Sequence, residues 1–172
     1  MTLEELNQLE ETACIKWFEQ TCAVQIWCQK MTSARPFQSA SQISTYAELF
    51  WQQCRDKDYL QAFEAHPMIG NVDTLREKFA DTKNTAASEQ AGAQAADEQT
   101  LQLLHQLNHE YLNKHGFIFI VFATGKSAAQ MLEILQQRLP NDTETEIKLA
   151  AAEQLKITLL RINKQLQTEG TL

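Results

Sequence analysis

The segment His66-Pro67-Met68-Ile69-Gly70 contains the histidine that is best suited to proton transfer. Pro67 fixes the backbone directly after the imidazole, and Gly70 permits a sharp turn. A histidine held in this way can act as a general acid or base near neutral pH. A loop histidine with no chemical role is the alternative, and these five residues alone leave both open.

A second titratable group lies in Ser88-Glu89-Gln90, near the expected start of a long helix. A carboxylate in a first helical turn is favoured by the helix dipole, and this fully accounts for Glu89. The functional alternative requires Glu89 to lie beside His66 in space, which sequence spacing does not show.

Two histidines, His105 and His109, stand four residues apart, as in the H-E-x-x-H sites that bind zinc. The position after His105 is Gln106 where that motif has a general base, and no third ligand is visible. We therefore predict exposed histidines beside Glu110 and no metal.

The segment Gly125-Lys126-Ser127 matches the end of a P-loop. The full pattern requires glycine where Ile120 stands, so we exclude a nucleotide site and predict that Ser127 caps a helix.

Arg161 lies between apolar residues. Its guanidinium either extends to water or lies in the interior, where it binds an anion or carbonyl groups.

Helical spacing of apolar residues covers most of the chain. It begins at a capping box, Thr2 and Glu5, and continues from Leu3 to Cys22. Further helices are predicted over residues 23–31, 41–54, 56–65, 86–114 and 127–139, with a loop near 30–41. A second capping box, Thr143 with Glu146, predicts a final helix through Ile162.

One apolar segment, residues 117–122, has the composition of a buried strand. A single strand has no partner for its backbone groups, so we predict a buried extended loop or a short helix. The hydrogen-bond partners of such a loop could include a ligand.

Length and charge narrow the class of protein. The 172 residues predict a single domain over 1–172, and the few glycines and prolines disfavour a β-rich fold. A net charge of -7 argues against nucleic acid, and no apolar run is long enough to cross a membrane. Four cysteines without C-x-x-C pairing and the absence of a secretory signal predict free thiols and a cytoplasmic location.

The chain resembles the family of 2-oxo-4-hydroxy-4-carboxy-5-ureidoimidazoline (OHCU) decarboxylases, which act in urate breakdown. The matching segments occur in family order over nearly the whole chain: Thr2-Leu3-Glu4-Glu5-Leu6-Asn7, Pro36-Phe37, Leu60-x-Ala62-Phe63-x-x-His66-Pro67-x-Ile69-Gly70, Glu89-Gln90-Ala91-Gly92, Asn108-x-x-Tyr111, Gly116-Phe117-x-Phe119-Ile120-Val121, Gly125-Lys126-Ser127, Arg138-Leu139 and Glu153-Gln154-x-Lys156-Ile157-x-x-Leu160-Arg161.

The resemblance implies an all-α single-domain bundle of about seven to nine helices, no cofactor and often a homodimer. It implies that His66 is catalytic and that Glu89 orients it. The substrate-binding residues that it implies are Pro67, Ala86, Ala87, Ser88, Gln90, Phe119, Ile120, Val121, Phe122, Ala123 and Arg161. On this view the unpaired backbone groups of the apolar segment bind the substrate.

The sequence departs from the family pattern at three positions. Family members commonly have a charged residue at Met68, serine at Ala86 and proline at Ile118. The change at Ala86 removes one substrate hydrogen bond, worth about 1 kcal/mol when neutral, unless Thr85 or Ser88 replaces it.

The implied reaction is cofactor-free decarboxylation of OHCU to (S)-allantoin, with His66 and Glu89 handling proton transfer at the hydroxyl-bearing centre. Two alternatives remain. One is a catalytically inactive helical binding module of the same fold, which the changes at Met68 and Ala86 support. The other is an unrelated helical regulator with a buried pocket for a small molecule.

Overall fold

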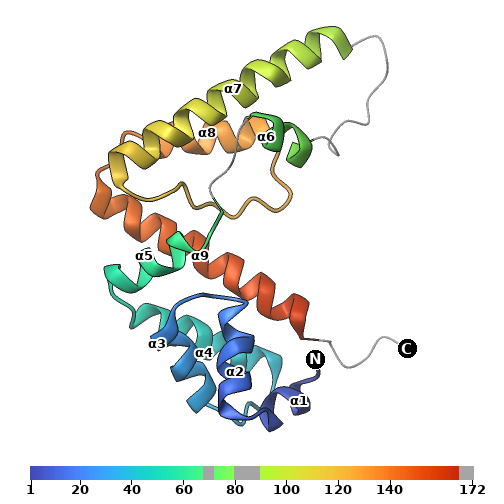
Figure 1. The fold of residues 1–172 in the computed structure, drawn as a ribbon, viewed down its shortest axis with the longest axis vertical. Helices are drawn as coiled ribbons and strands as arrows, with labels where there is room; N and C mark the ends of the chain where they lie inside the picture. Colours follow the sequence, from blue (N-terminus) through green and yellow to red (C-terminus); the bar gives the residue numbers. More distant parts are fainter. Residues whose placement is uncertain (68–71, 80–89, 167–172) are drawn as a thin grey trace. The chain divides into compact units, whose positions relative to one another are not determined.

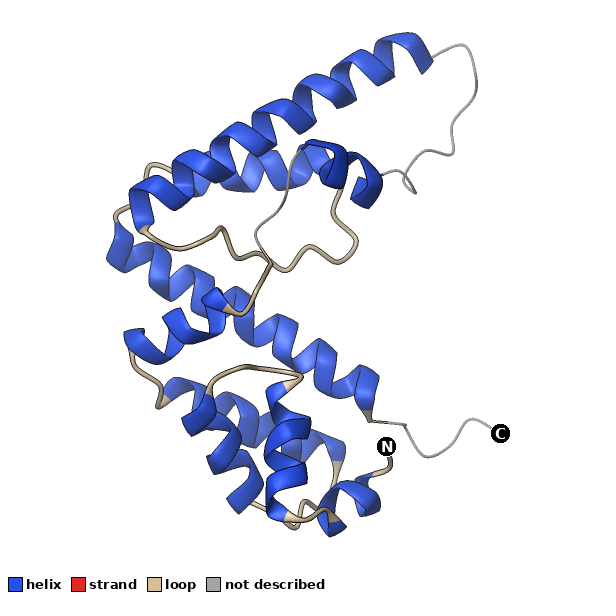
Figure 2. Cartoon of the chain, in the orientation of Figure 1, coloured by secondary structure: helices blue, strands red, loops and turns tan. Residues whose placement is uncertain are grey.

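The computed structural model describes residues 1–67, 72–79 and 90–166, and every regular element in these ranges is a helix (Figure 1, Figure 2). The helices are α1 (Leu3–Gln8), α2 (Glu11–Glu19), α3 (Gln25–Ser33), α4 (Ala40–Gln52), α5 (Asp56–Glu64), α6 (Val72–Phe79), α7 (Gln90–His115), α8 (Ala128–Arg138) and α9 (Thr143–Gln165). The predicted all-α class and number of helices are confirmed. Within the described ranges, no helix has the length and hydropathy needed to span a bilayer.

The chain forms two compact units, and each is described separately. The first contains Met1–Ala65 and Leu149–Leu172, and the second contains His66–Lys148. The boundary between them falls inside α9, near its beginning. The expectation of one domain over 1–172 stays a prediction.

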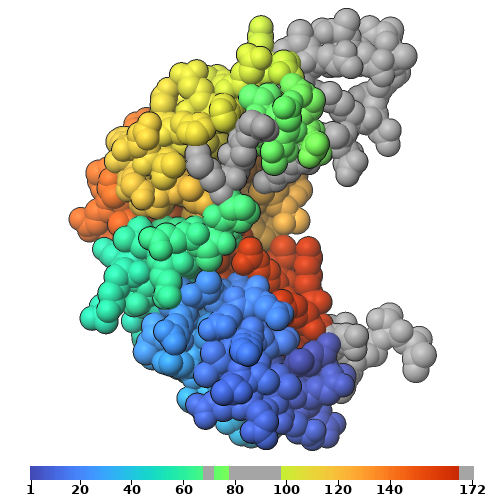
Figure 3. All heavy atoms as spheres, in the orientation of Figure 1, coloured from blue at the N-terminus to red at the C-terminus, as the bar shows by residue number. Residues whose placement is uncertain are grey.

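Aromatic side chains form the centre of the first unit. Phe18 is fully buried and meets Trp27 and Phe37 edge-on, with ring centroids 5.7 and 6.3 Å away. The Trp27 indole donates a hydrogen bond to the Ala47 carbonyl at 3.1 Å, so its one polar atom is satisfied inside the core. In the space-filling view, the atoms of α1 to α4 form one continuous body (Figure 3).

The N-terminal region contains two helices, although helical spacing continues from Leu3 to Cys22. The Thr2–Glu5 capping box is present, as predicted, but α1 ends at Gln8. The Arg35 guanidinium donates to the Leu9 carbonyl at 2.6 Å and satisfies the backbone at this break. Periodicity alone could not locate the break, because the arginine comes from the loop before α4.

In the second unit, α7 packs against both α6 and α8. Helix α7 ends at His115, and Gly116 follows with a φ of 78°, as its predicted position after the helix requires. Ser127 caps α8 through the amide of Gln130, which confirms that prediction. Helix α6 was not predicted from the sequence.

The buried face of α9 differs from the apolar pattern that predicts the helix. Most of its buried residues recur every four positions and are largely polar or small: Glu146, Ala150, Gln154, Thr158 and Ile162, with Ala151 buried beside them. Leu149 is 39% exposed instead. Buried polar side chains are tolerated when their polar atoms are hydrogen-bonded to one another, as the Gln154 amide is to the Thr158 hydroxyl at 3.2 Å.

Candidate functional site

His66 lies directly after α5, where the proline was predicted to end the helix. Helix α5 ends at Glu64, Ala65 caps it in a helical conformation, and the chain bends at His66. The His66 side chain is half-buried and Pro67 is exposed. The imidazole is therefore held at a helix exit, in the second unit.

The segment from Phe117 to Ala123 is an extended loop between α7 and α8. Phe117, Phe119 and Ile120 are buried, whereas the side chains from Val121 to Ala123 are half-buried. The prediction of a buried extended loop is confirmed, and the alternative of a short helix is wrong. Alternation of buried and less buried positions along 117–119 is typical of extended backbone.

Several backbone groups of this loop have no partner in the described part of the chain. The N–H groups of Phe119, Ile120 and Val121 donate to no other described residue. Three carbonyls are occupied: Ile120 accepts from Arg138 at 2.7 Å, Phe122 accepts from Lys126 Nζ at 2.7 Å, and Ala123 accepts from the Lys126 amide at 3.1 Å. The loop therefore offers a ligand donors from 119 to 121, and the Ile120 carbonyl is not available to it.

A buried ionic network lies beneath the loop. The Arg138 guanidinium donates to Glu146 Oε2 through Nε at 2.9 Å and Nη2 at 2.8 Å. The hydroxyl of Tyr111 donates to the same carboxylate oxygen, and Asn141 Nδ2 donates to the other at 2.7 Å. Glu146 and Tyr111 are 0% exposed and Arg138 is 8% exposed, so the ion pair and the phenol are buried, while Asn141 at the edge is half-buried.

The charge state of the network follows from these bonds. Burial opposes ionisation of Glu146, but the hydrogen bonds from Arg138, Tyr111 and Asn141 outweigh it and lower the pKa of this carboxyl. Burial, followed by the bond to Glu146, raises the pKa of Tyr111 far above its ordinary value. At neutral pH the network holds a carboxylate, a guanidinium and a neutral phenol.

Glu146 does not form the predicted capping box with Thr143. The Asp142 carboxylate caps the start of α9 by accepting from the Thr145 amide at 2.8 Å, while Glu146 points into the network instead. A capping box and a buried ion pair look alike in sequence, because both require a glutamate near a helix start. The sequence places Tyr111 on the helical period of residues 86–114 and Arg138 in a family segment, and it predicts no role for either in a polar network.

Arg161 lies on α9 in the first unit and is half-buried. Its Nη1 donates to the carbonyl of Thr21 at 3.3 Å. This supports an inward guanidinium that binds a carbonyl, rather than one that extends to water. The structure thus places Arg161 in one unit and both His66 and the 119–123 loop in the other.

The remaining predicted site residues fall at or beyond the described limits. Gln90 is the first residue of α7. Four predicted residues lie outside the described residues: Ala86, Ala87, Ser88 and Glu89.

The histidine pair on α7 has two neighbouring rings, with centroids 4.6 Å apart for His105 and His109. His109 is exposed as predicted, but His105 is half-buried. No group of three or more possible metal ligands occurs among the described residues. His115, the last residue of α7, pairs through Nδ1 with the Thr143 hydroxyl at 3.1 Å.

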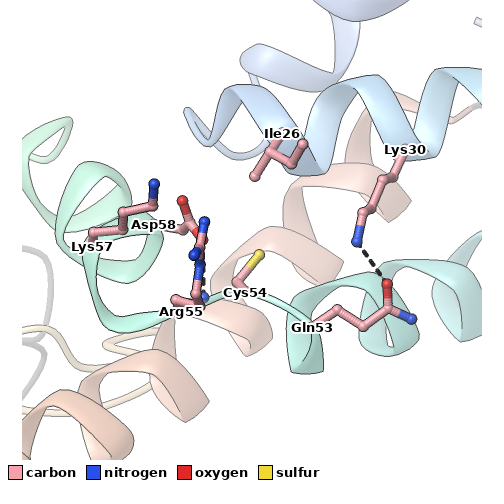
Figure 4. A pocket seen from close by; sticks show the side chains of 7 residues that line it. All are labelled: Ile26, Lys30, Gln53, Cys54, Arg55, Lys57 and Asp58. Atoms are coloured by element: carbon pink, nitrogen blue, oxygen red, sulfur yellow. Dashed lines mark hydrogen bonds between the residues drawn. The ribbon is translucent and has the colours of Figure 1, made fainter.

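The four cysteines are free thiols, as predicted, and one of them lines a cavity of about 470 Å³ in the first unit (Figure 4). Seven residues line it: Ile26, Lys30, Gln53, Cys54, Arg55, Lys57 and Asp58. Burial raises the pKa of Cys54 to about 11, so the thiol is protonated at neutral pH and is a poor nucleophile. None of the predicted site residues lines this cavity.

Comparison with known proteins identifies the family. The family model described as OHCU decarboxylase matches residues 7–163. The chain is 37% identical over 146 residues to the uric acid degradation bifunctional protein TTL of Arabidopsis thaliana, covering 83% of this chain and 44% of that protein. It is 26% identical over 140 residues to the mouse OHCU decarboxylase, covering 81% and 75%. The chain thus spans less than half the length of the bifunctional plant relative.

Solved structures show the same fold. A crystal structure of an OHCU decarboxylase in the presence of (S)-allantoin matches with a TM-score of 0.68 and 31% identity, covering 88% of this chain and 96% of that one. A crystal structure of (S)-allantoin synthase matches with a TM-score of 0.71 at 15% identity, which shows the fold alone. It covers 99% of this chain and 56% of that one.

The described helices therefore have the fold of the solved OHCU decarboxylase structure. The chain belongs to the OHCU decarboxylase family.

Proposed function

We propose that this chain decarboxylates OHCU to (S)-allantoin without a cofactor, with His66 and Glu89 as its proton-transfer pair. The observation that carries the proposal is the buried loop at 119–121, whose N–H groups have no partner among the described residues. Buried donors without partners cost free energy unless a ligand satisfies them. A flat ureido-imidazoline with carbonyl groups supplies the acceptors.

The reaction needs no external electron sink. The bond between the ring carbon and the carboxylate breaks, CO2 leaves, and the electron pair moves into the adjacent C=N, whose nitrogen takes a proton. The hydroxyl then becomes the product carbonyl by losing its proton while the ureido-bearing carbon gains one. The net change is loss of one CO2 and uptake of one proton.

The chain contributes position and proton transfer to this sequence. Fixed N–H donors at 119–121 stabilise negative charge as it develops on the ring, and they cost no reorganisation at that moment. The rigid exit of α5 presents His66 for proton exchange, and Glu89 orients it. Arg161 is proposed to bind an anionic or carbonyl part of the substrate.

Turnover of freshly prepared OHCU tests the proposal. We expect the chain to consume OHCU far faster than the spontaneous reaction in the same buffer, at a rate proportional to protein concentration. The inactive binding module would bind (S)-allantoin and leave the rate unchanged. The family match already excludes the third alternative, an unrelated helical regulator.

Chelation is expected to leave the rate unchanged. The described residues contain no group of three metal ligands, and the proposed steps require no Lewis acid. The measurement is turnover after exhaustive dialysis against a strong chelator. A loss of activity that zinc or manganese restores would assign a metal to His105 and His109.

Replacing Glu89 with Gln is expected to lower kcat severalfold or more and to leave affinity for (S)-allantoin nearly unchanged. The amide keeps the shape but cannot stabilise the imidazolium. Steady-state kinetics and calorimetric titration with the product measure the two effects. Wild-type kinetics in this variant would show that Glu89 serves only the helix start.

The proposal also includes a cytoplasmic location and a homodimer, both of which the family resemblance implies. Light scattering tests the second, with an expected mass of twice 19.6 kDa. A mass of 19.6 kDa at working concentration would reject the homodimer and leave the proposed reaction untouched.

A further inference from the structure

We propose that Arg138 is a positioning residue for the substrate loop, and that Glu146 and Tyr111 hold it in place. This inference rests on the proposed function for its kinetic consequences. Arg138 touches the loop twice: Nη1 donates to the Ile120 carbonyl at 2.7 Å, and its guanidinium carbon lies 4.7 Å from the centre of the Phe119 ring. It lies on the last turn of α8, and the Ile120 bond is buried.

The bond to Ile120 fixes the direction of the next N–H group. The peptide between Ile120 and Val121 is trans, because within the described ranges the one cis peptide bond joins Arg35 and Pro36. In a planar trans peptide the C=O and N–H groups point in opposite directions. Because Arg138 holds the Ile120 carbonyl on one side, the Val121 N–H is presented on the other.

Glu146 and Tyr111 set the position of the guanidinium. Nε and Nη2 of Arg138 both bind Glu146 Oε2, which leaves Nη1 to reach the loop. The Tyr111 hydroxyl binds the same carboxylate oxygen, and its ring meets the Phe119 ring edge-on with centroids 5.3 Å apart. A lysine could not replace this arrangement, because its single nitrogen cannot serve the carboxylate and the carbonyl through a rigid fork.

The test compares Arg138→Lys with Asn141→Ala. The lysine keeps a charge opposite Glu146 but loses the fork. The alanine removes the 2.7 Å bond from Asn141 to the other carboxylate oxygen, and among the described residues no hydrogen bond joins the Asn141 side chain to the loop. If Arg138→Lys fails to fold, a double variant, Arg138→Gln with Glu146→Gln, takes its place in the test. The double variant removes both buried charges together.

Two readouts separate positioning from stability alone. Backbone order parameters of Ile120 and Val121, measured by 15N relaxation without ligand, are expected to fall from about 0.85 to below about 0.6 in Arg138→Lys. The kcat/KM for OHCU is expected to fall about 10- to 100-fold, with KM raised. Asn141→Ala should lower thermal stability and leave both readouts at their wild-type values.

Different results would overturn the positioning role of Arg138 and the proposed decarboxylase function. A folded Arg138→Lys protein with wild-type order parameters and wild-type KM would overturn the positioning role, even if the chain produces (S)-allantoin. A wild-type chain that produces no (S)-allantoin would overturn the proposed function, while the order parameters would still decide whether Arg138 fixes the loop.

Discussion

Replacing His66 with Asn is expected to lower the rate of OHCU turnover by about 10²- to 10⁴-fold, the range that a positioned general acid or base contributes. Asparagine keeps a polar group of similar size but cannot exchange protons at neutral pH. The half-buried position after α5 tolerates such a side chain, so the fold should persist. Steady-state kinetics measure the loss, and circular dichroism of the protein checks the fold.

The matched controls for this substitution lie on α7. His105→Asn and His109→Asn change the other histidines that the sequence singles out, and both should retain nearly wild-type turnover. A folded His66→Asn protein with a rate close to wild type would contradict the assignment of proton transfer to His66. Loss of activity in either control would instead implicate the pair His105 and His109 on α7 in catalysis.

Replacing Glu146 with Gln is expected to lower the free energy of unfolding at pH 7 by about 3 kcal/mol. The substitution leaves the buried Arg138 guanidinium without a counter-charge, and breaking one side of a buried ion pair is costly. For a domain whose total stability is about 5–15 kcal/mol, this is a large fraction. Urea denaturation followed by circular dichroism measures it.

Glu144→Gln is the matched control, because it makes the same chemical change on the same helix. Glu144 pairs with Lys148 at 2.7 Å, but the two side chains are 76% and 68% exposed. Such a pair contributes about 0.2–1 kcal/mol, so the control should be nearly silent. Equal effects of the two substitutions would show that the buried network does not stabilise the fold.

The stability difference between the wild type and Glu146→Gln is also expected to depend on pH. The pKa of Glu146 is lowered in the folded protein from an ordinary value near 4.5. Ionised Glu146 therefore contributes its full stabilisation when the pH is above its ordinary pKa. This stabilisation is lost as the pH falls through the lowered pKa of the folded protein. The difference in unfolding free energy between wild type and Glu146→Gln should narrow below pH 4.5.

The sequence predicted the helices well where local signals are strong. Capping residues such as Thr2 and Ser127 and the glycine after α7 act within a few residues of the backbone that they complete. The predicted loop at 117–122 also follows from local chemistry, because an isolated strand leaves its backbone unpaired. Local rules could not find the break between α1 and α2, where the satisfying group is the distant Arg35.

The site was predicted less completely, and for the same reason. The role proposed for His66 comes from the family resemblance, because the segment from His66 to Gly70 alone leaves that role open. The network of Tyr111, Arg138 and Glu146 joins side chains from three successive helices, and each member has an ordinary local explanation. Only the fold shows that their polar atoms meet.

The enantiomeric purity of the product tests the central claim most directly. Free OHCU gives an intermediate that can be protonated on either face, so spontaneous decay should yield racemic allantoin. A ring held against the 119–123 loop exposes one face to one proton donor. Circular dichroism of the product should therefore show (S)-allantoin with the wild-type chain and a signal near zero in the enzyme-free control. Racemic product from the wild-type chain would contradict the account.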